Sequence, residues 1–218
     1  MNTIIERGRI ISVFERQINK LERREISRLF GIQPENLEPW LAEFGVTEAS
    51  LADAGGKSFI VLPSGLIQPS KQRNFWEQLC PNLNLSDTMI ERVMPHLDDD
   101  LPTEAYVLKS VFFDLQSETA EKAVEDWPRL QKELMDVGRK CLTGQELITL
   151  VAYDSRRFDA MLALGSTREG VVPCFEPISD YWEFSLHCLG NMIDRETKRW
   201  VSPFGGAKRV VAPTAKRL

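Results

Sequence analysis

The chain has 218 residues, is 43% hydrophobic and 27% charged, and so has the composition of a folded globular protein with a sizeable core. No apolar stretch approaches the roughly 20 residues that a membrane-spanning helix needs, so we expect no membrane association. The N-terminus leads directly into an amphipathic pattern with acidic residues, which predicts no signal peptide and an intracellular location: cytoplasmic, nuclear or virion-internal.

The net charge of −5 is unevenly distributed. Residues 1–30 carry +3 and residues 195–218 carry +6, which leaves −14 for the middle of the chain. Basic ends on an acidic body favour binding of a polyanion through those ends, or docking of the ends on the acidic body of another copy.

The chain has few cysteines and histidines, and they lack the short paired spacings of a metal site. The cysteines and histidines are Cys80, Cys141, Cys174, Cys188, His96 and His187. We therefore expect reduced, partly buried cysteines, no structural metal and no cofactor.

Apolar residues near the N-terminus predict a long first helix, because they recur at spacings of three, four and seven. The residues on this face are Ile4, Ile11, Phe14, Ile18 and Leu21.

Residues 24–62 carry the most informative pattern of the chain. A short helix over 24–30 is expected to stop at Gly31, and a second one to run from about Asn36 to Gly45. Gly55 and Gly56 then predict the tip of a hairpin before a buried strand at 59–62. The order of helix, turn, helix and hairpin resembles a winged helix, a module that binds nucleic acid or protein.

The second of these short helices has no lysine or arginine, and it carries Glu35, Glu38 and Glu43. Carboxylates there would repel the phosphates of a DNA groove, so the pattern favours contact with protein. In this respect the segment resembles the scaffolding winged helices of large assemblies, such as the winged-helix half of PCI domains. The resemblance rests on no family-specific motif.

Helical patterns dominate the remainder of the sequence. Helices are predicted from Ser86, over 103–115, 119–137 and 158–164, and from Ser179 through an aromatic stretch. Thr143 and Glu146 have the spacing of a capping box before 147–153, although that apolar run also fits a strand. Residues 170–177 are expected to be extended or looped.

The predicted fold is therefore mainly α with a small β-hairpin. A winged-helix-like module (1–68) is expected to precede a helical domain (71–195) and a basic flexible tail (196–218).

Two sets of residues are candidates for binding. Tyr181 and Trp182 are either an interaction patch or part of the core, which is the commoner place for such side chains. Basic side chains near the two ends are candidates for binding nucleic acid or an acidic partner, with Trp200 available to stack on a base. These are Arg7, Arg9, Lys198, Arg199, Trp200, Lys208, Arg209, Lys216 and Arg217.

Catalytic motifs are not evident. His96 beside the acidic run 98–100, a Cys174–His187 pair and an anion site at Arg156 and Arg157 are the candidates, and none has a recognisable set of partners. We therefore expect a non-catalytic interaction, assembly or regulatory subunit, with a protein partner or a second copy bound. The alternative is a nucleic-acid-associated regulator or packaging factor that binds the phosphate backbone through its basic ends.

Overall fold

The structure is a computed structural model that describes most of the chain. The described residues are 4–6, 9–53, 57–84, 101–112, 127–154, 160–178, 181–188, 196 and 210–216. Within them, no helix has both the length and the apolar character needed to cross a lipid bilayer.

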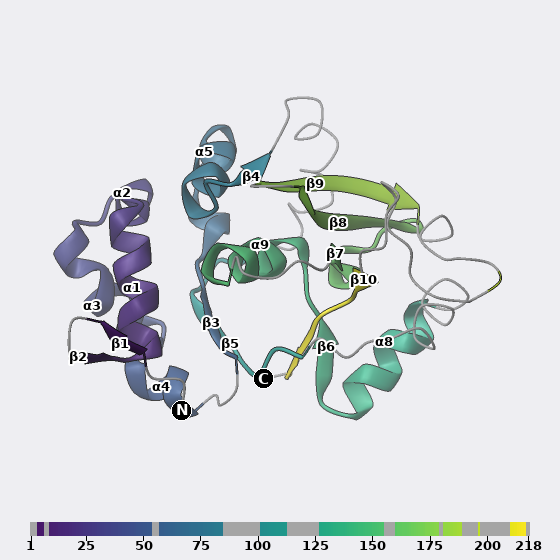
Figure 1. The fold of residues 1–218 in the computed structure, drawn as a ribbon, viewed down its shortest axis with the longest axis horizontal. Coiled ribbons are helices and arrows are strands. Elements are labelled where there is room, and N and C mark those ends of the chain that lie inside the picture. The colour runs from purple at the N-terminus through teal and green to yellow at the C-terminus, as the bar shows by residue number, and fades with distance from the viewer. Residues whose placement is uncertain are drawn as a thin grey trace.

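The N-terminal part is a hairpin followed by short helices (Figure 1). Strands β1 (Ile4–Glu6) and β2 (Arg9–Ile11) pair in antiparallel fashion. The helices that follow are α1 (Val13–Arg23), α2 (Ile26–Leu29), the 3₁₀ turn η1 (Pro34–Asn36), α3 (Leu37–Glu43) and α4 (Glu48–Asp53).

A five-stranded mixed sheet forms the largest β-element. Its centre is antiparallel, and a short parallel strand lies at each edge. The order is β10 (Val210–Val211), β7 (Ala160–Leu162), β8 (Val171–Ile178), β9 (Tyr181–Cys188) and β4 (Leu83–Asn84).

Among the described residues, the body also contains two smaller antiparallel sheets and three α-helices. Strand β3 (Phe59–Val61) pairs with β5 (Tyr106–Leu108), and β6 (Arg139–Cys141) pairs with β11 (Thr214–Lys216). The helices are α5 (Pro69–Leu79), α8 (Trp127–Asp136) and α9 (Gly144–Tyr153).

Helix α9 lies at the centre of the body, between the large sheet and the β3–β5 pair (Figure 1). Its residues from Gly144 to Ala152 are all buried, because they are apolar on nearly every side.

The main core runs from Phe14 of α1 to Ala215 of β11 and so crosses the predicted boundary at 68–71. The division of the chain into units stays a prediction. A second, smaller core joins α8 to the opposite face of the large sheet.

The prediction of a mainly α fold is wrong, because the structure is a mixed α/β protein. The helices expected over 103–115, 158–164 and from Ser179 contain strands β5, β7 and β9 instead. In β9 the buried rings of Trp182 and Phe184 alternate with more exposed neighbours, and the full length of the strand pairs with β8. Cross-strand burial therefore overrides the helical spacing of the aromatic residues.

The winged-helix prediction is also wrong. The residues before Gly55 and Gly56 form helix α4 and not a strand, and β3 pairs with the distant β5. The two glycines themselves lie outside the described residues. The helices before this point are as expected, since Gly31 and Gly45 adopt positive φ of 71° and 74° at the ends of α2 and α3.

Both ends of the chain contain more β-structure than expected. Helix α1 begins only at Val13, where the Ser12 hydroxyl accepts a hydrogen bond from the Glu15 N–H. Residues 4–6 and 9–11, expected in this helix, form the antiparallel strands β1 and β2. Residues 210–216, expected as part of a flexible tail, are built into two sheets. The tail prediction is therefore wrong for this segment.

Candidate interaction surface

The helices after Leu29 carry an acidic surface. The chain has no lysine or arginine from residue 29 to residue 56, but it has five carboxylates there. All five are exposed, and we call them the acidic face: Glu35, Glu38, Glu43, Glu48 and Asp53. Three of them are the acidic residues that the sequence proposed for protein contact.

Packing on the inner side of α3 and α4 orients these carboxylates outward. Leu37 and Leu41 of α3 and Leu51 of α4 are buried. The start of α4 is capped reciprocally, since the Thr47 N–H donates to the Ser50 hydroxyl at 2.8 Å and the Ser50 N–H to the Thr47 hydroxyl at 3.2 Å. The buried leucines and the cap of α4 therefore fix the two helices that carry most of the acidic face.

Half-buried aromatic rings lie beside the acidic face. The ring centre of Trp40 lies 5.0 Å from the ring centre of Phe30 and 5.4 Å from the ring centre of Phe44. Phe30 in turn contacts buried Phe75 of α5, with the ring centres 5.9 Å apart. Partly exposed aromatic groups bordered by charged residues are typical of protein-binding surfaces. The sequence analysis did not single out these partly exposed rings.

Buried polar contacts anchor α1, and with it the acidic face, to the body. The Gln17 side chain donates to the Ser58 carbonyl and accepts from the Ile60 N–H, both at 2.8 Å. Arg24 donates to the carbonyls of Leu79 and Ala152 at the ends of α5 and α9. Burial lowers the pKa of the Arg24 guanidinium, and neighbouring Cys80 and Tyr153 oppose that shift.

Tyr181 and Trp182 point to opposite faces of β9, as consecutive residues of a strand do. Tyr181 is 38% exposed, whereas Trp182 is only 4% exposed and belongs to the main core. Of this predicted patch, only Tyr181 is therefore available to a partner.

The structure brings Cys174 and His187 onto one face of the β8–β9 hairpin. Cys174 is paired in register with Ser185, whose hydroxyl lies 2.7 Å from His187 Nε2. Burial raises the pKa of the Cys174 thiol, with Glu176 adding to the shift, and burial lowers the pKa of His187 against the opposing effect of Glu176. The cysteine is fully buried, and its raised pKa disfavours the thiolate form that a nucleophile requires. The sequence missed Ser185, which the alternation Ser-x-His in a strand would have indicated.

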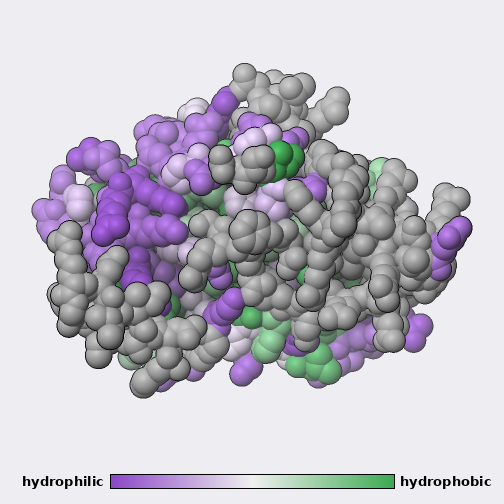
Figure 2. Space-filling view, in the orientation of Figure 1, coloured by the Kyte–Doolittle hydropathy of each residue, from purple (hydrophilic) through white to green (hydrophobic). Residues whose placement is uncertain are grey.

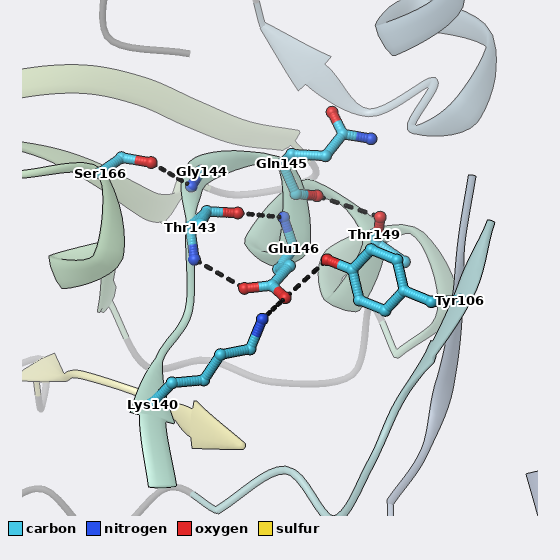
Figure 3. Close-up of polar contacts among 8 residues, drawn as sticks. All are labelled: Tyr106, Lys140, Thr143, Gly144, Gln145, Glu146, Thr149 and Ser166. Carbon is cyan, nitrogen blue, oxygen red and sulfur yellow. Dashed lines mark hydrogen bonds and ion pairs between the residues drawn. The ribbon is translucent and has the colours of Figure 1, made fainter. Parts of the chain in front are cut away.

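A second polar cluster lies at the start of α9 (Figure 3). The fully buried Glu146 carboxylate accepts from Lys140 Nζ at 2.5 Å, from the Tyr106 hydroxyl at 2.7 Å and from the Thr143 N–H at 2.9 Å. The predicted capping box is confirmed, because the Thr143 hydroxyl in turn accepts from the Glu146 N–H. Since the carboxylate is enclosed by these donors, this cluster fixes the start of the central helix.

Most of the residues predicted to bind nucleic acid or an acidic partner lie outside the described residues: Arg7, Lys198, Arg199, Trp200, Lys208, Arg209 and Arg217. The same holds for His96, the acidic run 98–100, Arg156 and Arg157. Arg9 lies in β2, and Lys216 is exposed at the end of β11.

Within the described part of the chain, no three His, Cys, Asp or Glu side chains gather to form a metal site. Comparisons of the chain with protein-family models, with curated proteins and with solved structures give no match.

Proposed function

We propose that the protein is a non-catalytic interaction subunit, of an assembly or regulatory kind, whose acidic face binds a basic polypeptide. The observation that supports the proposal is the combination of five exposed carboxylates with the partly exposed rings of Phe30, Trp40 and Phe44. Lysine and arginine side chains of a partner would pair with the acids, and its apolar groups would cover the rings.

The charge of this surface argues against a nucleic-acid partner at the same place. Glu35, Glu38 and Glu43 are exposed without a basic residue nearby in the sequence. These carboxylates would repel a phosphate backbone at this surface.

Binding of a fluorescent deca-lysine peptide, measured by anisotropy at low salt, tests the proposal. The variant E35Q/E38Q/E43Q removes three charges without adding bulk. Exposed pairs contribute about 0.5 kcal/mol each, so we expect about tenfold weaker binding. Higher ionic strength is expected to weaken the wild-type complex as well.

A matched control removes three acids elsewhere: E77Q/E104Q/E169Q. Glu77 is partly exposed and paired with Arg73, and Glu104 and Glu169 are exposed. This control is expected to bind the peptide within about twofold of the wild type. Equal weakening by both triple variants would mean that only net charge matters, and no binding by the wild type at low salt would refute the proposal.

A further inference from the structure

A second surface of opposite character lies where α8 turns into β6. It consists of three exposed apolar residues, Phe112, Met135 and Val137, and two cations, Arg139 and Lys216, and we call it the cationic patch. Phe112 is 36%, Met135 46% and Val137 69% exposed. Figure 2 shows hydrophobic side chains at the lower edge of the molecule, over this region. Apolar groups this exposed are a mark of interaction surfaces when they gather.

The patch is built on the edge formed by β6, β11 and Phe112. Phe112 and Thr214 exchange backbone hydrogen bonds of 2.8 and 3.0 Å, and Lys216 is paired in register with Arg139. The Arg139 guanidinium lies 4.7 Å from the centre of the Phe112 ring, and its Nε donates to the Thr214 hydroxyl at 3.0 Å. The arrangement is therefore fixed by the fold.

The charge of this region is positive. Lys109 is half-buried in the neighbouring segment, and its carbonyl accepts from the Lys216 N–H at 3.0 Å. Asp136 is an exposed acid immediately before Val137. Lys140 contributes little outward charge because it is directed to the buried Glu146.

We infer that the partner of the cationic patch is a second copy of this chain, which docks its acidic face there. The inference rests on the proposed function, because it uses the same acidic face. The two surfaces are complementary in charge, and each combines charged groups with apolar side chains: Phe30, Trp40 and Phe44 on one, Phe112, Met135 and Val137 on the other. A nucleic-acid strand would satisfy Arg139 and Lys216 but leave Met135 and Val137 uncovered.

This contact is heterologous, because the two surfaces that meet are different. A docked pair keeps one unused cationic patch on one copy and one unused acidic face on the other, so association continues into chains or closes into a ring. Burial of partly exposed rings and apolar side chains supplies the main attraction, and the charges set orientation and rate of encounter.

Light scattering after size separation tests the inference with two one-sided variants. E38K/E43K damages the acidic face, and V137E/K216E damages the cationic patch. The four positions are exposed, so both variants are expected to fold like the wild type, which circular dichroism checks. The wild type is expected to exceed its 24.9 kDa monomer mass increasingly with concentration, and less so at about 0.5 M salt.

Each variant alone is expected to be monomeric, and an equimolar mixture to form a dimer, because each partner retains one intact surface. A wild type that stays monomeric at about 1 mM, or a mixture no larger than its components, would overturn the inference. Binding of a labelled 20-nucleotide strand by the wild type that V137E/K216E abolishes, without self-association, would assign the patch to nucleic acid instead. Deca-lysine binding with a monomeric wild type would leave the proposed function intact and refute self-association alone.

Discussion

Residues 60–67 and residues 160–167 follow nearly the same backbone path in two different parts of the molecule. Each segment leaves a buried strand, β3 or β7, and passes through a residue at φ −77° and ψ 68° (Pro63) or φ −86° and ψ 68° (Ala163). Each then enters a 3₁₀ turn, η2 (Ser64–Leu66) or η4 (Leu164–Ser166), with a glycine at its centre. The glycine N–H donates to the carbonyl of Pro102 at 2.8 Å in the first and of Leu142 at 2.9 Å in the second.

The two turns are stabilised in different ways. In the first, Gln72 of α5 reaches into the turn and donates to the carbonyls of Ser64 and Ile67 at 2.6 and 2.9 Å. In the second, the turn itself supplies the polar group, since the Ser166 hydroxyl accepts from the Gly144 N–H at the start of α9 (Figure 3). The same backbone conformation is therefore stabilised by a side chain from outside the turn in one case, and in the other it supplies a side chain that stabilises a neighbouring helix.

The largest effect is expected from Gly165→Ala. A Cβ at this position would lie 2.8 Å from backbone atoms of Cys141 and Leu142, so the backbone must shift. We expect a loss of about 3 kcal/mol in the free energy of unfolding, measured by denaturant titration. Gly170→Ala is the control, because its Cβ meets nothing within 4 Å and only its positive φ of 75° is unfavourable, for about 1 kcal/mol. Equal losses of unfolding free energy in the two variants would show that the close approach of the Cys141 and Leu142 backbone is not the reason why position 165 needs glycine.

Gln72→Leu is expected to have the second-largest effect on stability, and it changes the first turn alone. The change removes the donor to two carbonyls and the acceptor of the Trp76 indole N–H at 3.1 Å, all in buried surroundings. Unpaired buried polar groups of this kind predict a loss of about 2 kcal/mol on denaturant titration. Gln78→Leu on the same helix is the control, because the Gln78 amide N–H donates to the Asn74 side-chain oxygen at 3.2 Å in exposed surroundings. A larger loss from the control would contradict the account.

Gly65→Ala sharpens the comparison between the two glycines. Its Cβ would lie 3.0 Å from the carbonyl oxygens of Leu101 and Pro102, which is less severe than the 2.8 Å approach at Gly165. A loss of about 1.5 kcal/mol is expected, about half that of Gly165→Ala under the same denaturant. The opposite order of the two losses would mean that the segment 101–102 is the more rigid neighbour.

Sequence alone predicted the parts of the fold that depend on neighbouring residues. The stops at Gly31 and Gly45 and the capping box of Thr143 and Glu146 are local, and all are confirmed. The strand at 59–62 was predicted as well, but its pairing with a distant segment was not, as in the pair of Phe59 with Leu108. Strands β5, β7 and β9 were missed because their residues were assigned to helices. The similarity of the two turns is likewise hidden, because only Leu62 with Leu162 and Gly65 with Gly165 are identical at matching positions.

The candidate surfaces show the same limit. The exposed acids of the acidic face could be predicted, because a run without lysine or arginine is visible in the sequence. The cationic patch could not, since Phe112, Arg139 and Lys216 are far apart along the chain and meet only through β6 and β11. Trp182 was ambiguous because aromatic residues occur in cores and interfaces alike, and the register of β8 and β9 places it inside.

The smallest expected effects concern the two serines of the turns. Ser166→Ala removes the acceptor of the Gly144 N–H, which lies 2.9 Å away in buried surroundings, and should lower the free energy of unfolding by about 1 kcal/mol.

The Ser64 hydroxyl is buried without a hydrogen-bond partner in the described part of the chain, so Ser64→Ala removes a polar group that is not satisfied there. We expect it to leave stability unchanged or to raise it by up to about 1 kcal/mol. Amide exchange at Gly144 separates the two, because only Ser166→Ala should accelerate it. A destabilising Ser64→Ala would show that the first turn, too, uses its own hydroxyl.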